Sequence, residues 1–269
     1  MSFQLSPDKI YMAPVGFGPA LCSIQNQDGG RYRADQLKEH VDQYTLSFAA
    51  GRDDLSAWLP EGLSLAAEQL IVRYERLTNV TWLAGRGFHR LELLLPVLRG
   101  GADGLFRLAA WESNADSILQ GRDIFGRAVA YAAMEQDRTG DALRLTASNW
   151  GFCFLELEIR AGGAQGAGLL PGLLARGRRV YHHRYLPRTG EKFVNSDADY
   201  LVSAPLCDPA PDPAPCTGTI RWNRPAFEDA PTQYYFLQPL AALALGPCTG
   251  GLHAEFDRFS DGYDQTILD

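Results

Sequence analysis

Apolar and polar residues alternate along most of the chain, a pattern typical of β-strands that bury one face. Residues 70–76 are an example, because Leu70, Val72 and Tyr74 fall on one side and the residues between them on the other. Comparable runs predict strands at 43–48, 89–98, 105–111, 142–147, 152–160, 180–186, 217–222 and 233–237. Glycine and proline separate these runs, and this spacing favours an antiparallel sheet system or a barrel.

Helical patterns are few and short. Residues 53–59 form one predicted helix, with Asp53 as its N-cap, and the apolar turn 169–175 forms another. The glycine-rich segment 161–168 has neither GxGxxG spacing nor a following lysine, so we interpret it as a surface loop rather than a phosphate-binding loop. The proline-rich segment 208–215 is predicted to be a stiff, extended connector.

Length and composition fit one folded domain, residues 1–269, because 46% of the residues are hydrophobic and the length suits a single core. The formal net charge is −7, and the longest basic cluster covers only residues 176–179, which argues against a nucleic-acid surface. The N-terminus does not resemble a secretory signal, and no apolar stretch approaches the roughly 20 residues that span a bilayer. We therefore expect a cytoplasmic protein without nucleic-acid or membrane partners.

Residues 121–130, Gly-Arg-Asp-Ile-Phe-Gly-Arg-Ala-Val-Ala, resemble the catalytic segment of acetoacetate decarboxylases and their superfamily. In that family Gly-Arg-Glu, a short spacer and Pro-Lys-Lys occur in this order, and the first lysine forms a Schiff base with a keto acid. Val129 stands in the place of that lysine, between Ala128 and Ala130. Valine has no amine, so the chain resembles a divergent superfamily member that lacks the Schiff-base lysine.

The resemblance extends along nearly the whole chain, and from Glu75 to Gly121 it needs no insertion or deletion. Further segments that resemble the family are the opening loop 13–19, the Leu-Pro-Glu-x-Leu turn 59–63, the Val-Arg-aromatic-Glu strand 72–75, and the later strands 179–187 and 230–237. The resemblance implies a mainly β (α+β) fold, an antiparallel β-barrel with few short helices. We also expect a homo-oligomer, a small-molecule substrate and no cofactor.

Two further positions of the implied site have changed. Glu75 matches the family's first glutamate, whereas Arg90 stands where the second is expected, and Val41 or a neighbour replaces an arginine near the substrate carboxylate. Glu75 remains a candidate general base, and Arg90 offers fixed donors for an enolate oxygen. The alternative is a structural salt bridge between Glu75 and Arg90 on neighbouring strands.

Two adjacent histidines, His182 and His183, are further candidate catalytic residues, because one of two neighbouring strand positions faces inward and histidine titrates near neutral pH. The alternative is a hydrogen-bonded core or surface histidine. The candidate substrate-binding residues are Tyr74, His89, Arg122 and Val129. His89 and Arg90 point to opposite faces unless the strand bends or bulges. No metal site is expected, since the histidine pair lacks ligand geometry and neither HExxH nor CxxC occurs.

Two functional hypotheses follow. The first is a lyase- or cyclase-type biosynthetic enzyme that acts on a keto acid or a polyketide-like intermediate by enol or enolate chemistry, such as dehydration, cyclisation or aldol reaction. It would do so without an imine, unless Lys192 were a relocated amine. The second is a non-catalytic barrel that binds a small ligand, because a retired enzyme would also lose its nucleophile. The ligand environment of Glu75 and Val129 would distinguish the two.

Overall fold

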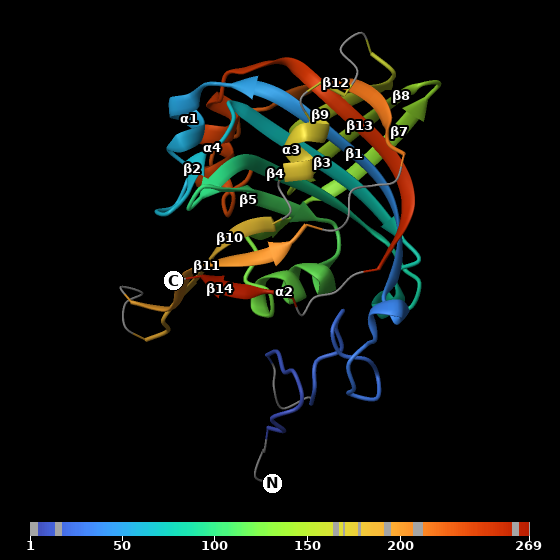
Figure 1. Cartoon of the computed structure of the whole chain (residues 1–269), viewed down its shortest axis with the longest axis vertical. Coiled ribbons are helices and arrows are strands. Elements are labelled where there is room, and N and C mark those ends of the chain that lie inside the picture. The colour runs from blue at the N-terminus through green and yellow to red at the C-terminus, as the bar shows by residue number, and fades with distance from the viewer. Residues whose placement is uncertain are drawn as a thin grey trace.

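The structure is a computed structural model that describes residues 5–13, 18–163, 167–168, 170–176, 179–190, 195–206, 212–259 and 264–268. Lys192 and residues 14–17 of the N-terminal resemblance lie outside these ranges. The described chain is mainly β, with few short helices, as predicted (Figure 1).

The strands are β1 (Lys38–Ala50), β2 (Ser64–Leu65), β3 (Gln69–Thr78), β4 (Phe88–Arg99), β5 (Ala102–Glu112), β6 (Val129–Tyr131), β7 (Ala133–Thr139), β8 (Ala142–Asn149), β9 (Phe152–Ala161), β10 (Arg179–Pro187), β11 (Ser196–Pro205), β12 (Ala214–Trp222), β13 (Leu245–Phe259) and β14 (Thr266–Leu268). The helices are α1 (Arg52–Ser56), α2 (Ala115–Asp123), α3 (Leu170–Arg176) and α4 (Tyr234–Ala242), and short 3₁₀ turns lie at Ala34–Gln36 and Thr81–Leu83.

All the strands belong to one 14-stranded sheet, in the order β14-β11-β10-β5-β4-β3-β1-β13-β12-β9-β8-β7, with β2 beside β4 and β6 beside β5. The pairs are antiparallel except that β5 runs parallel to both β10 and β6. Among the described residues no pairing joins β14 to β7, so closure into the predicted barrel is not detected.

The sheet curls around a large apolar core, and Trp111 of β5 lies at the centre of that core. The fully buried Trp111 ring is 5.3 Å from the Phe154 ring of β9, 6.1 Å from Trp222 of β12 and 5.7 Å from Phe236 of α4, measured between centroids. Its indole N–H donates to Gln233 Oε1 at 2.9 Å. Trp111 therefore joins two parts of the sheet that are not neighbours in strand order.

The other face of β3, β4 and β5 carries charged residues beside a small apolar cluster that includes Ile71 and Leu94. Alternation turns Glu75 away from the Trp111 core, and register places it opposite Arg90, which in turn faces Glu112. Arg73 faces Glu92 two residues further along the same pair of strands. This register brings acidic and basic side chains together on one surface.

Two predicted elements differ from the structure. Residues 233–237 are not a strand, because α4 covers Tyr234–Ala242 and buries Leu237 and Leu240, three positions apart on one helical face. α1 overlaps the predicted helix 53–59, but its N-cap is Gly51 rather than Asp53.

Other elements had no usable periodic signal. The long strand β13 contains glycines and a proline that interrupt its alternation. Helix α2 begins where the Asn114 side chain accepts a hydrogen bond from the Ser117 N–H at 2.9 Å. The predicted connector 208–215 is described only from residue 212, and its last residues pair with β13 at the start of β12. No helix in the described part of the chain has the length and apolarity that a bilayer crossing requires.

Replacing Trp111 with alanine is expected to lower the free energy of unfolding by about 3–5 kcal/mol, because the cavity would lie between β5, β9 and α4. Trp150 is the matched control, since it is 79% exposed, and Trp150→Ala should change stability by less than about 0.5 kcal/mol. Urea unfolding measured by circular dichroism provides both values. Equal effects in the two variants would contradict the central role of Trp111.

Candidate functional site

A chamber of about 90 Å³ lies on the charged face of β3, β4 and β5. It is lined by residues from these strands, β13, the segment after α2, and β10, whose Val180 contributes an apolar wall. The charged residues that line it are Glu39, Arg73, Glu75, Arg90, Glu92, Arg107, Arg127 and Arg258. We call this the arginine–glutamate chamber.

Glu75 is the most strongly paired carboxylate in the chamber. Arg258 Nη1 lies 2.9 Å from Glu75 Oε1, and Arg90 Nη1 lies 3.2 Å from Glu75 Oε2. Burial alone would raise the pKa of Glu75, but the guanidiniums of Arg258 and Arg90 outweigh it and hold the pKa below its usual range. The ordinary state of Glu75 is therefore the carboxylate.

Arg90 extends the network to β5. Its Nε donates to Glu112 Oε1 at 2.6 Å, while its Nη1 contacts Glu75. Burial would lower the pKa of Arg90, but the carboxylates of Glu112 and Glu75 raise it above its usual value. Arg258 is held in the same way, because its Nε donates to Glu39 Oε1 at 2.7 Å.

Glu92 is the second buried acid of the chamber. Arg107 Nε donates to Glu92 Oε1 at 2.8 Å, and Arg73 Nη1 lies 3.9 Å from Glu92 Oε2. Burial would raise the pKa of Glu92, but the guanidiniums of Arg107, Arg90 and Arg73 lower it to about 2. This carboxylate thus remains ionised across the physiological range.

Arg127 differs from the other arginines of the chamber. Within the described part of the chain its guanidinium forms neither a hydrogen bond nor an ion pair, and its buried Nε has no partner. Its guanidinium stacks on the Phe125 ring at 4.6 Å. Burial and the neighbouring guanidiniums of Arg107 and Arg90 lower the pKa of Arg127 to about 10. No carboxylate among the described residues forms an ion pair with Arg127, although Glu112 and Glu92 act on its charge from a longer distance.

Other buried polar atoms near the chamber also lack partners among the described residues. They are Arg73 Nε, Glu112 Oε2 and His182 Nδ1. Buried polar atoms in proteins are normally hydrogen-bonded, so a group of unpartnered ones marks a place with unused capacity to bind. Here both donors and acceptors are available.

The two candidate histidines have different environments. His182 is fully buried, and its Nε2 lies 2.7 Å from the Phe125 carbonyl oxygen, so Nε2 carries the proton and donates it. Burial, reinforced by Arg107, lowers the pKa of His182 to about 3, and the ring is neutral. His183 is partly exposed, with its Nε2 2.8 Å from Asp199 Oδ1. His182 is therefore the inward-facing member of the pair.

Tyr74 and His89 lie on the opposite face of the sheet from Glu75 and Arg90. The Tyr74 hydroxyl donates to Gln136 Oε1 at 2.8 Å and lies 2.6 Å from His89 Nδ1, which must then be the donor to the tyrosine oxygen. Burial, with a smaller effect from Arg76, lowers the pKa of His89. The sheet therefore separates Tyr74 and His89, two candidate substrate-binding residues, from Glu75 and Arg90.

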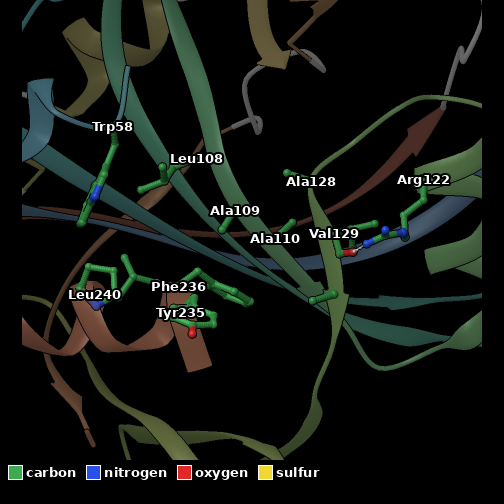
Figure 2. A pocket seen from close by; sticks show the side chains of 12 residues that line it. Trp58, Leu108, Ala109, Ala110, Arg122, Ala128, Val129, Tyr235, Phe236 and Leu240 are labelled. Atoms are coloured by element: carbon green, nitrogen blue, oxygen red, sulfur yellow. Dashed lines mark hydrogen bonds between the residues drawn. The ribbon is translucent and has the colours of Figure 1, made fainter. Parts of the chain in front are cut away.

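Val129 and Arg122 line a different, apolar cavity of about 470 Å³ (Figure 2). Figure 2 shows the Arg122 side chain directed at the Val129 backbone, and its Nη1 donates to the Val129 carbonyl oxygen at 3.2 Å. Val129 is buried, and a Cβ at Gly121 would lie only 3.1 Å from its Cγ1. Val129 is therefore closely packed against α2. The aromatic walls of this cavity are Trp58, Tyr235 and Phe236.

Several residues that line the chamber were absent from the sequence-based candidates: Glu39, Arg73, Glu92, Arg107, Arg127 and Arg258. A usable signal existed for those on β3–β5, because charged residues at alternate positions of otherwise apolar strands must share one buried face. Arg258 reaches Glu75 from a strand that is distant in the sequence. Within the described ranges, no three His, Cys, Asp or Glu residues are grouped as a metal site.

The family model described as acetoacetate decarboxylase matches residues 24–255 of the chain. None of the curated proteins matches the sequence of this chain. Solved structures match the chain at low sequence identity, so their similarity shows the fold alone.

Three of these structures illustrate the likeness. The acetoacetate decarboxylase of Legionella pneumophila has a TM-score of 0.65 and 14% identity, with 87% of each chain covered. The acetoacetate decarboxylase-like enzyme of Sphingomonas wittichii has a TM-score of 0.64 and 18% identity, over 86% of this chain and 92% of that chain. The enduracididine biosynthesis enzyme MppR complexed with pyruvate has a TM-score of 0.62 and 14% identity, over 91% and 95% of the two chains.

Replacing Glu92 with glutamine should lower the free energy of unfolding by about 3–5 kcal/mol near neutral pH, because buried Arg107 and Arg73 lose their carboxylate. The folded-state pKa of Glu92 is about 2, below the usual 4.5, so its contribution is complete above the usual value. That contribution disappears as pH falls from 4.5 towards 2. The stability difference between wild type and variant should shrink over the same window.

Denaturant unfolding at a series of pH values measures this difference. Glu68→Gln is the control, since its partner Arg52 is exposed and the pair is 2.9 Å apart at the surface, and it should cost only about 0–1 kcal/mol. A difference that stayed constant down to pH 3 would contradict the depressed pKa of Glu92.

Proposed function

The chain belongs to the acetoacetate decarboxylase family, and from this premise we propose that it binds a small keto acid in the arginine–glutamate chamber and promotes enolisation without a Schiff base. The observation that carries the proposal is Arg127, a partly buried residue whose Nε is buried and whose guanidinium has no hydrogen bond or ion pair among the described residues. A guanidinium offers parallel donors that match a carboxylate or an enolate oxygen. Pyruvate, the ligand of the structural neighbour MppR, belongs to the same substrate class.

The size of the chamber favours a small keto acid over a polyketide-like intermediate. Its volume of about 90 Å³ is several times the roughly 15 Å³ that admits one water. A head group of a few heavy atoms fits within that space, whereas a polycyclic or long-chain intermediate does not.

The chemistry would consist of moving a proton from the carbon next to the ketone. Loss of that proton leaves an electron pair shared between carbon and the ketone oxygen, and nearby guanidinium donors stabilise the resulting enolate. Glu75 is the proposed proton acceptor. In the free protein two guanidiniums depress its pKa, which makes it a weak base. A bound carboxylate that takes donors from Arg90 or Arg258 would relieve this effect and raise the pKa of Glu75.

A non-catalytic binding barrel is the second candidate, and a specific observation favours it. Glu75 already accepts from both Arg258 and Arg90, and Val129 is packed against Gly121, as expected of a site that has lost its chemistry. Binding of a keto acid without proton exchange would support this alternative.

Exchange of the pyruvate methyl protons for deuterium, followed by NMR in D₂O, tests enolisation directly. The wild-type protein should accelerate exchange above the rate without protein, and Glu75→Gln should slow it by about a hundredfold. Arg127→Met should weaken pyruvate binding about tenfold or more, since hydrogen bonds to charged groups contribute roughly 1.5–3 kcal/mol.

Arg127→Met is a sharp test because Arg127 has no ion pair with any residue that the structure describes, so the substitution breaks no described salt bridge. Arg52→Met is the control, because it removes an exposed guanidinium that is paired with Glu68. Acceleration equal to wild type in Glu75→Gln would exclude Glu75 as the base. Calorimetry that detected no pyruvate binding to the wild type would refute the proposed function.

Borohydride treatment in the presence of pyruvate should leave the mass of the protein unchanged, because Val129 offers no amine for imine formation. Intact-mass spectrometry checks this result. A reduced adduct mapped to Lys192 would instead identify a relocated Schiff-base residue and overturn the imine-free mechanism.

A further inference from the structure

A surface cleft of about 370 Å³ adjoins the arginine–glutamate chamber. The end of α2 and the segment that follows it line one side of the cleft, and β10 lines the other through residues 183–186. Arg127 lines both the cleft and the chamber. A single side chain therefore borders the two spaces, and a ligand bound in the chamber beside Arg127 is close to the cleft.

Positive charge predominates in the cleft. Arg122, Arg127 and Arg184 line it, with Asp123 as the acidic counterpart, whereas the whole chain carries a formal charge of −7. The remaining titratable group with an ionic contact is His183, whose ring contacts Asp199 at 2.8 Å. This local reversal of charge favours an anionic ligand.

The arginines of the cleft are held in place by neutral partners. Arg184 Nη1 donates to the Ile124 carbonyl oxygen and its Nη2 to the Asp123 carbonyl oxygen, both at 3.2 Å. Arg122 donates to the Val129 carbonyl oxygen at 3.2 Å. Carbonyl groups orient a guanidinium without cancelling its charge, so each arginine retains the ability to attract an anion.

The backbone at Gly126 leaves room for the Arg184 side chain. Gly126 has a φ of 64°, and a Cβ at this position would lie 2.6 Å from Arg184 Cδ. Any larger residue would meet both the strain of positive φ and the arginine side chain. The close approach keeps Arg184 beside the residue that precedes Arg127.

We propose that the cleft is a second anionic subsite and that the ligand is a keto diacid. Its keto-carboxylate end enters the chamber, and its distal carboxylate lies in the cleft within reach of Arg184 and Arg122. This inference rests on the proposed function, because it assumes that the chamber holds the keto acid head. It goes further by assigning the class of substrate: a 2-keto acid whose chain ends in a carboxylate.

The test compares 2-oxoglutarate with 2-oxopentanoate by calorimetry on the full chain. The two compounds share a five-carbon 2-keto acid chain and differ only in a terminal carboxylate or methyl group. 2-Oxoglutarate should bind about tenfold more tightly, equivalent to about 1.4 kcal/mol for the distal carboxylate. Arg184→Gln should reduce this affinity ratio towards one, and Arg184→Lys should retain part of it because the charge is kept.

The control variant is Arg52→Met, which should keep the wild-type ratio. A thermal melt of each variant verifies folding, which matters because Arg184 also holds the Ile124 and Asp123 carbonyls. If Arg184→Gln unfolds, the same question is tested on the wild type at increasing salt concentration. The ratio of the two affinities should then fall, because salt screens exposed charges.

The outcomes distinguish failure of the diacid subsite from failure of the proposed function. If neither 2-oxoglutarate nor 2-oxopentanoate binds, the proposed function itself is wrong. Equal binding of the two compounds would overturn the diacid subsite while leaving the proposed function intact. A preference for 2-oxoglutarate that persisted in Arg184→Gln would also overturn it, because the distal carboxylate would then be recognised elsewhere.

Discussion

A charge removed from water is tolerated only when other charges or dipoles replace the lost hydration, and this constraint governs the charged face of the sheet. Glu75 on β3 is matched by Arg90 on β4 and Arg258 on β13, and these arginines are matched by Glu112 on β5 and Glu39 on β1. The pairs link five strands. A register shift of one residue in any of them would turn a charge into the apolar core.

The same constraint explains which parts of the structure were accessible from the sequence. Alternation in the apolar runs predicted β3, β4 and β5, and the spacing of Glu75 and Arg90 placed them on neighbouring strands. Arg258 was not accessible, because 183 positions separate it from Glu75 and its strand contains glycines that hide the alternation. Long-range pairing depends on strand order, which local patterns do not encode.

Short segments were also ambiguous for physical reasons. Residues 233–237 are too few to separate a strand from a helix, and the burial of Leu237 and Leu240 against the core decides for α4. Resemblance to a family placed Val129 and the strand of Tyr74 at the expected site, and His89 was a candidate as the neighbour of Arg90. The parity of each strand then determined their faces, and it turned Tyr74 and His89 away from the chamber.

The stretch from the last turn of α2 to β6 borders the apolar cavity, the cleft and the chamber, since Arg122 lines the apolar cavity and the cleft while Arg127 lines the cleft and the chamber. It is a short connection, and the sheet pairs that stabilise the fold lie outside it. The side chains that border these cavities are therefore largely separate from the strand pairs that hold the sheet together. Such a division allows evolution to exchange one chemistry for another by rewriting a few residues of a single loop on an unchanged scaffold.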